Sequence, residues 1–225
     1  MFIGTLVANA NQQRLEGRET QHRLDQLKPE LQRIRGRAEL LRDYYAATRD
    51  YAENAFAGWK GDPRVNDSDF VISAFQASQI KAMASTSGSW ATIVGADQLR
   101  NIDQPTIREP MLRLMTYPEE NLGLVRVQSE YRSLVRTIIP DDTQELIRKE
   151  CGDYFATPDA LDFSLVARCP LTLDPEGAAA TAAELRRHPE LVGKLRLHLA
   201  LVASLLNDVQ IYDTAARRLR EELGR

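Results

Sequence analysis

The chain has 225 residues, of which 43% are hydrophobic and 27% are charged, an ordinary balance for a globular protein with a sizeable core. Its formal net charge of −3 comes from 32 acidic and 29 basic residues that are mixed along the chain. Because no basic stripe is offered to a phosphate backbone, the composition predicts no nucleic-acid partner.

The chain opens on a short apolar run, Phe2–Ala10, which continues directly into polar residues. A bilayer span needs about 20 apolar residues, and a signal peptide needs a basic start and a small-residue cleavage site. The run meets neither requirement. Two interpretations remain: the first turns of an amphipathic helix, or the last turns of a membrane span whose upstream part lies outside this sequence.

A long helix is predicted over the segment that follows. Apolar or small residues recur in steps of three and four from Leu24 to Ala55, with polar residues between them. This heptad pattern is typical of a helix that packs along another helix. Pro29 interrupts the pattern without changing its register, so we expect a kink there rather than an end of the helix.

Glycine and proline are predicted to end this long helix at the stretch that contains Gly58, Gly61 and Pro63. Directly after it, Asp67 or Ser68 is placed to cap the N-terminus of a new helix, because a short polar side chain can accept a backbone N–H there.

Shorter amphipathic helices are predicted in the middle of the chain, within residues 68–85, 89–102, 104–117 and 119–139. Pro110 and Pro118 divide this region, so one straight helix over 105–139 is not expected. The segment 140–174, rich in Asp, Pro, Gly and Thr, is predicted to be a turn-rich insertion. Within it, the acids of Pro140–Asp142 indicate helix capping rather than a metal site.

The C-terminal region repeats the pattern of the first long helix. Apolar residues again recur in steps of three and four from Leu191 to Leu223. At 1.5 Å per residue, each of the two seams is about 48 Å long. Helices of matched length are natural neighbours in a bundle. The predicted fold is therefore all-α, an elongated helical bundle with long paired, coiled-coil-like N- and C-terminal helices and shorter helices between them.

The only two cysteines, Cys151 and Cys169, lie 18 residues apart. This spacing matches no usual metal box, and no histidine is near, so a zinc site is not predicted. As a disulfide the pair would close a loop in the turn-rich insertion and stabilise the fold by about 3 kcal/mol. Such a bond would place the domain outside the reducing cytosol. The alternative is two unrelated buried thiols in a cytosolic protein.

Few residues are candidates for chemistry. His22 lies among charged residues, and His188 precedes a proline at a predicted turn, whereas His198 sits in the apolar seam of the last helix. A polar residue in such a seam more often sets register or bonds a neighbour than binds a ligand. Trp90 and Tyr117 mark the middle helices, where a ligand pocket would lie. No nucleophile elbow, dinucleotide fingerprint or phosphate loop occurs, so no catalytic residue, cofactor or metal is predicted.

Three features of the sequence together resemble a known kind of protein: the opening "FIGTLVANANQQRLEGRE", the middle "GSWATIVGADQLRNIDQPTIREPMLRLM" and the last helix that begins "HPELVGKLRLHLALV". They resemble a family of uncharacterised bacterial proteins with one N-terminal membrane span. The family's middle pattern of a turn, apolar residues and a glycine is matched here by Trp90, Ile93, Gly95, Leu99, Ile102 and Ile107.

The resemblance implies a helical domain that is tethered to the bacterial inner membrane and faces the periplasm, with no known activity. It favours the interpretation of residues 1–10 as the end of a truncated span, which leaves residues 11–225 as a single bundle domain. The cytoplasm remains the alternative location.

The sequence is consistent with two functions. The first is a non-catalytic, membrane-anchored domain that binds a partner protein or acts as a scaffold, including a homodimer through the N-terminal helix. That helix has a seam of small residues, among them Ala38, Thr48, Ala52 and Ala55, which would admit a second chain. The alternative is a ligand-binding sensor domain or an enzyme with its site among the middle helices. An exposed apolar stripe along residues 24–55 would favour the first, and a pocket lined by convergent polar groups the second.

Overall fold

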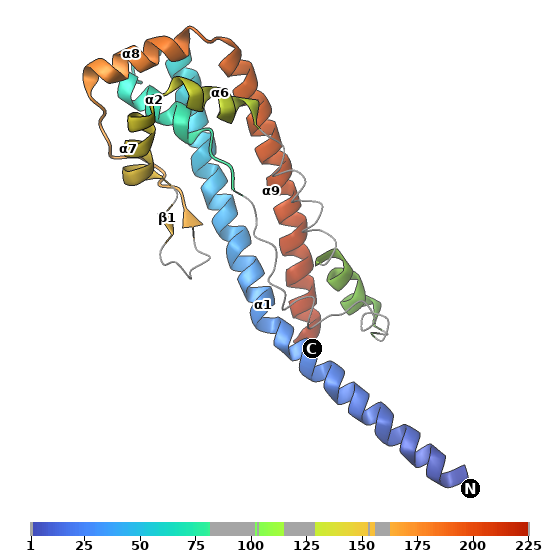
Figure 1. The fold of residues 1–225 in the computed structure, drawn as a ribbon. Helices are drawn as coiled ribbons and strands as arrows, with labels where there is room; N and C mark the ends of the chain where they lie inside the picture. The colour runs from blue at the N-terminus through green and yellow to red at the C-terminus, as the bar shows by residue number, and fades with distance from the viewer. Residues whose placement is uncertain are drawn as a thin grey trace. The chain divides into compact units, whose positions relative to one another are not determined.

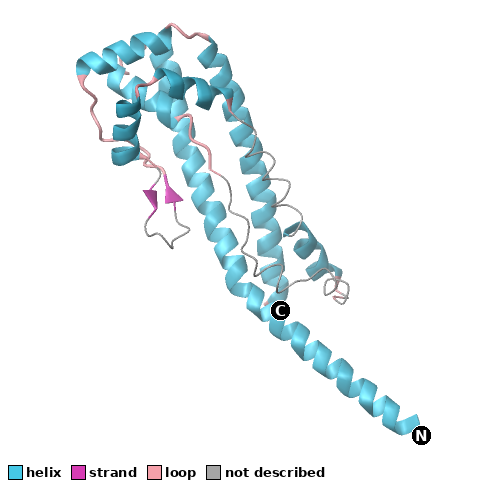
Figure 2. Cartoon of the chain, in the orientation of Figure 1, coloured by secondary structure: helices cyan, strands magenta, loops and turns pink. Residues whose placement is uncertain are grey.

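The computed structural model describes residues 2–81, 102, 104–114, 129–152, 154–155 and 163–224. The protein is an all-α bundle (Figures 1 and 2). Its labelled elements are α1 (Phe2–Trp59), α2 (Asp67–Gln76), α6 (Glu130–Ile138), α7 (Asp141–Cys151), α8 (Pro175–Arg186), α9 (Glu190–Leu223) and two strands of two residues each, β1 (Tyr154–Phe155) and β2 (Phe163–Ser164). Residues 105–114 are also helical.

The chain divides into two compact units, and both long helices contribute to each of them. Unit 1 comprises Met1–Gly36, Ala84–Glu119 and Ile211–Arg225. Unit 2 comprises Arg37–Met83 and Glu120–Gln210. Within unit 2, the short helices α2, α6 and α8 contact one another near the end of α1 and the beginning of α9 (Figure 1).

Both predicted seams are buried in the chain's own core. In unit 2, Leu41, Tyr45 and Ala52 of α1 belong to the same buried cluster as Leu195 and Leu205 of α9. In unit 1 the buried residues of the two helices include Leu27, Leu31, Ile34, Tyr212, Ala216, Leu219 and Leu223. The prediction of long N- and C-terminal helices that pack on each other is therefore confirmed.

The small residues of the α1 seam are not open to a second chain, contrary to the expectation from the sequence. Ala38, Thr48, Ala52 and Ala55 are all fully buried, because side chains of the same chain fill the space beside them. The exposed apolar stripe that would have favoured partner binding through this seam is therefore not present over residues 25–55. A homodimer through the N-terminal helix stays a prediction.

The ends of the first two helices follow local rules. α1 continues through Pro29, as predicted, and ends in a Schellman motif in which Gly61, at φ 71°, follows the helix. The Gly61 N–H donates to the Gly58 carbonyl, and the Asp62 N–H to the Ala57 carbonyl. Helix α2 begins one residue earlier than the predicted caps allow.

The cap of α2 is Asn66, so the prediction of Asp67 or Ser68 was wrong. The Asn66 Oδ1 atom accepts a hydrogen bond from the Asp69 N–H at 2.8 Å. Asp67 instead lies in the first helical turn, where its charge favours the positive end of the helix. The Ser68 hydroxyl accepts the Leu173 N–H at 2.9 Å and so holds a distant segment of the chain.

The prediction of a turn-rich insertion over residues 140–174 was wrong for its beginning, where the predicted helix capping by the acids of Pro140–Asp142 is followed by a full helix. The first third of this segment is helix α7, with Asp141 and Asp142 in its first turn and Arg148 and Lys149 in its last. These charges complement the helix dipole, which explains why a polar segment forms a helix here. The strands β1 and β2 follow and pair antiparallel.

Among the helices that the structure describes, none is both long enough and apolar enough to cross a membrane. Phe2–Ala10 are helical, as the beginning of α1.

Candidate functional site

His198 of α9 lies at the centre of a buried hydrogen-bond network in unit 2. Its side chain is 1% exposed. The Nδ1 atom lies 2.8 Å from the Ser129 hydroxyl, and the Nε2 atom lies 3.3 Å from the Gln79 carbonyl oxygen. One tautomer satisfies both contacts: the Ser129 O–H donates to Nδ1, and the Nε2–H donates to the carbonyl of Gln79.

The imidazole of His198 is held in its neutral form. Burial is the main cause that lowers the pKa of His198 from 6.5 to about 4, and the positive charge of Arg132 acts in the same direction. The hydrogen bond to the Gln79 carbonyl opposes these two effects, because it favours the protonated ring. At neutral pH the ring is therefore an uncharged bridge between two helices and the chain after α2.

Ser129 has two structural tasks in this network. It is the N-cap of α6, where its Oγ atom accepts the Arg132 N–H at 3.2 Å, and its hydroxyl also contacts His198. A serine beside a histidine can form a nucleophile and base pair. Here, however, the serine oxygen holds a helix end and the second ring nitrogen of the histidine meets a backbone carbonyl. This geometry is that of a structural bridge.

The network extends over the C-terminal end of α2, where helix carbonyl groups lack partners within the helix. The Tyr131 hydroxyl donates to the Ala74 carbonyl at 2.8 Å, and the Arg132 guanidinium donates to the Ser78 carbonyl at 2.9 Å. From α1, the Tyr45 hydroxyl donates to the Lys81 carbonyl at 2.6 Å. Donors from three different helices, α1, α6 and α9, therefore converge on this end of α2 and on the residues after it.

The disulfide between Cys151 and Cys169 closes the segment that contains the two strands. Cys151 is the last residue of α7, and the two Cα atoms lie 5.4 Å apart. Two hydrogen bonds tie the segment to the helices: the Gln76 side chain donates to the Cys151 carbonyl, and the Tyr51 hydroxyl donates to the Val166 carbonyl at 2.9 Å. The predicted cysteine pairing is thus present in the structure.

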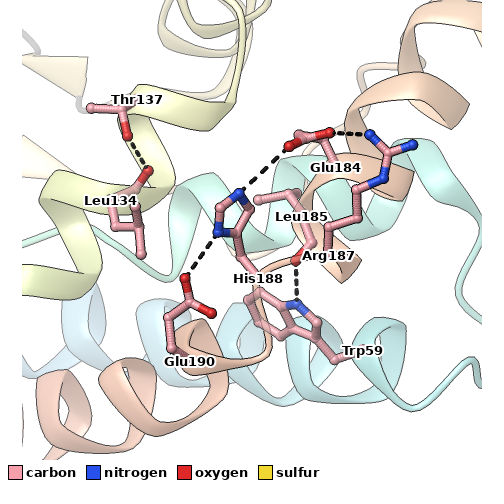
Figure 3. Close-up of polar contacts among 8 residues, drawn as sticks. All are labelled: Trp59, Leu134, Thr137, Glu184, Leu185, Arg187, His188 and Glu190. Carbon is pink, nitrogen blue, oxygen red and sulfur yellow. Dashed lines mark hydrogen bonds and ion pairs between the residues drawn. The ribbon is translucent and has the colours of Figure 1, made fainter.

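His188 lies at the corner between α8 and α9, with a carboxylate at each ring nitrogen (Figure 3). Its Nδ1 atom is 2.9 Å from Glu190 Oε1, and its Nε2 atom is 3.5 Å from Glu184 Oε1. The hydrogen bond that the protonated ring donates to Glu190 is the main cause that raises the pKa of His188. At the same corner the Trp59 indole donates to the Leu185 carbonyl at 3.1 Å, which fastens the end of α1 to α8 (Figure 3).

Unit 1 contains a charged pocket of about 500 Å³. Its lining residues are Arg35 of α1 and Arg217, Arg220, Glu221 and Gly224 at the C-terminal end of the chain. The pocket is lined by polar groups, and none of these lining residues comes from the middle helices where the sequence predicted a ligand site. Trp90 and Tyr117, the residues that marked that predicted site, lie outside the described residues.

Sequence reasoning identified His198 and the two cysteines but missed the partners of the histidine. Ser129 precedes a strongly amphipathic segment and could have been found as a helix cap. Gln79 and Arg132 carry no local signal, because their roles depend on which helices meet. In the described part of the chain, no group of three or more His, Cys, Asp or Glu residues is arranged to hold a metal ion.

These observations define the class of protein: an all-α, disulfide-closed bundle whose buried polar groups hold its helices together. Comparisons with family models, curated proteins and solved structures give no match to this chain.

Proposed function

We propose that this protein is a non-catalytic helical domain that faces the periplasm, is anchored to the bacterial inner membrane and works by binding a partner protein or as a scaffold. On this proposal the anchor includes Phe2–Ala10 or lies upstream of it. The observation that carries the proposal is the disulfide between Cys151 and Cys169. Disulfides persist in oxidising compartments and are rare in the reducing cytosol.

The surroundings of the disulfide support a stabilising role rather than a reactive one. Cys151 is 2% exposed, and its carbonyl accepts a hydrogen bond from Gln76. The segment that it closes is held to α1 by Tyr51, whose pKa burial raises to about 12. A bond that fastens a peripheral segment to a helical core is typical of a domain that must persist outside the cell's reducing interior.

The buried serine and histidine pair supports a non-catalytic role for the same unit. Ser129 caps α6, and both nitrogens of His198 are used in contacts that join elements of the fold. A general base needs a nitrogen within reach of the proton that it removes from a substrate. In this network both ring nitrogens already have partners inside the protein.

The test is an intact mass of the native protein taken from its own cell envelope, after thiol alkylation without reductant. The proposal expects no alkylation of Cys151 or Cys169 and recovery of the protein with the inner membrane. A matched sample that is reduced first should take two labels. Two labels without reduction, together with recovery in the soluble cell fraction, would contradict the proposal.

The second candidate is a ligand-binding sensor domain. The specific observation that favours it is the charged pocket of unit 1, which brings several ionic side chains to one cavity. The location experiment does not decide between partner binding and ligand sensing, so the pocket needs a test of its own.

A further inference from the structure

The pocket of unit 1 is built from two segments that are far apart in the sequence. Arg35 comes from α1, whereas Arg217, Arg220, Glu221 and Gly224 come from the last turns of the chain. The spacing of Arg217, Arg220 and Glu221, i, i+3 and i+4, places them on one face of α9, and Gly224 follows the end of this helix. Together with Arg35 they line an open pocket of about 500 Å³, a volume within the range of small-molecule sites.

The charge of this pocket is unbalanced, because the described residues that line it contribute three guanidinium groups and one carboxylate. Neither Arg217 nor Arg220 forms an ion pair with any residue that the structure describes. The closest polar contact of Arg217 is a long one of 3.5 Å to the Thr214 hydroxyl. Arg35 lies beside a carboxylate, with its Nε atom 3.7 Å from Asp213 Oδ1.

Like charges that share one cavity repel each other, and an anion bound among them removes that repulsion. The guanidinium group is planar and presents its donors in a fixed fork that matches the oxygens of phosphate. We propose that this pocket binds a ligand that carries a phosphate group, through Arg35, Arg217 and Arg220. Glu221 repels the phosphate itself and accepts a hydrogen bond from a hydroxyl or ammonium group elsewhere on the ligand.

The phosphate can belong to a soluble phosphate ester or to the headgroup of an anionic lipid, since both offer the same oxygens to the arginines. The inference goes beyond the proposed function, because it holds whether the domain faces the periplasm or the cytoplasm. Its failure would leave the disulfide argument unchanged.

The first experiment titrates the full-length chain with inorganic pyrophosphate by calorimetry at low salt. We expect saturable binding, and a loss of at least tenfold in affinity in the double variant Arg217→Gln/Arg220→Gln, because each charged hydrogen bond contributes substantially. Arg218→Gln is the matched control, since Arg218 is exposed on the same helix but does not line the pocket. Its affinity should stay within twofold of the wild type.

Glu221→Gln gives an independent test with the opposite sign. Removal of the one carboxylate among the described residues that line the pocket should tighten pyrophosphate binding several-fold, a gain that a general loss of structure cannot produce. This variant also keeps the proposal falsifiable if the double arginine variant fails to fold, which its circular dichroism will show.

The second experiment separates the two sources of phosphate by sedimentation with vesicles of phosphatidylglycerol or of phosphatidylcholine. If the protein binds the anionic vesicles, if pyrophosphate competes with this binding, and if the binding requires Arg217 and Arg220, then the phosphate belongs to a lipid headgroup. Pyrophosphate binding without vesicle binding assigns a soluble ligand. The proposal is overturned if neither probe binds saturably, or if Arg218→Gln weakens binding as much as the double variant does.

Discussion

Replacing His198 by leucine removes two buried hydrogen bonds at once. The Ser129 hydroxyl and the Gln79 carbonyl then lose a partner in a site from which water is excluded. Each such loss costs about 1–3 kcal/mol, so we expect His198→Leu to lower the free energy of unfolding by about 2–6 kcal/mol. Urea denaturation followed by circular dichroism measures this change.

Ser129→Ala provides the control for that prediction through a double-mutant cycle. Because Ser129 and His198 share a hydrogen bond, the double variant should lose about 1 kcal/mol less than the sum of the two single variants. Strict additivity would show that the bond contributes nothing, and a stability of His198→Leu equal to the wild type would contradict the network.

The stability of the fold should fall as the pH is lowered, because of His198. Burial lowers the pKa of His198 to about 4 in the folded state, against 6.5 in the unfolded chain. Between these two pKa values the unfolded state therefore binds more protons than the folded state, so that protons stabilise the unfolded state increasingly as the pH falls. Between pH 7.5 and pH 5 this effect of His198 should lower the free energy of unfolding by about 2 kcal/mol.

Comparison with His198→Leu isolates this contribution from that of the carboxylates. The difference in unfolding free energy between wild type and variant should shrink towards pH 5, because the variant has no imidazole to protonate. His188 acts in the opposite direction: its pKa is raised by Glu190 and Glu184, so its stabilisation is complete below pH 6.5 and is lost as the pH rises. A difference that is constant with pH would contradict the neutral buried state of His198.

Within helix α1, the replacement of two glycines by alanine should change the stability of the protein in opposite directions. A Cβ atom at Gly58 would lie 2.1 Å from Phe70 Cδ2, so either α1 or the Phe70 ring would have to move to relieve the clash. Overpacking of this kind costs about 1–3 kcal/mol. At Gly36 nothing lies within 4 Å of the added atom, and alanine there should stabilise the helix by about 0.5–1 kcal/mol. Thermal melts of the two variants should shift in opposite directions.

Helix α9 permits a similar comparison between a buried and an exposed leucine. Leu205 is 6% exposed, whereas Leu197 is 58% exposed. Leu205→Ala should lower the free energy of unfolding by about 2–5 kcal/mol, because it leaves a cavity in the core. Leu197→Ala should change it by no more than about 0.5 kcal/mol. Equal urea midpoints for the two variants would contradict the assignment of the predicted seam to the core.

The long helices could be predicted because their signal is repeated over many residues. The steps of three and four correctly assign Leu41, Tyr45 and Leu205 to the core. Single positions are less well determined by such a pattern: the cap of α2 falls on Asn66, because Asn and Asp cap helices almost equally well and three such residues stand close together. The extent of helix α7 was missed, although the acids at its start indicated a helix end, because only Leu146, Ile147 and Cys151 of its 11 residues are apolar and so few cannot form a repeated pattern.

The buried network could not be predicted beyond His198 itself. Ser129 and Gln79 lie 69 and 119 residues away from the histidine along the chain. Their meeting depends on how α2, α6 and α9 pack, and no local pattern encodes this. The pocket of unit 1 has the same origin, since Arg35 joins residues of α9 only through the packing of two long helices.

At the scale of the whole molecule, the disulfide should contribute to stability mainly by restricting the unfolded chain. Cys151 and Cys169 close a loop with a sequence separation of 18, and loops of this size stabilise by about 3 kcal/mol. Reduction of the wild type should therefore lower its urea midpoint markedly. Cys151→Ser/Cys169→Ser should unfold at that lower midpoint whether or not reductant is present. Because α7 and the segment after it also hold Gln76 and Tyr51, the reduced protein should keep its helical circular dichroism below the transition. A wild-type midpoint that reductant leaves unchanged, in a sample shown by mass to be reduced, would mean that these hydrogen bonds hold the segment without the covalent bond.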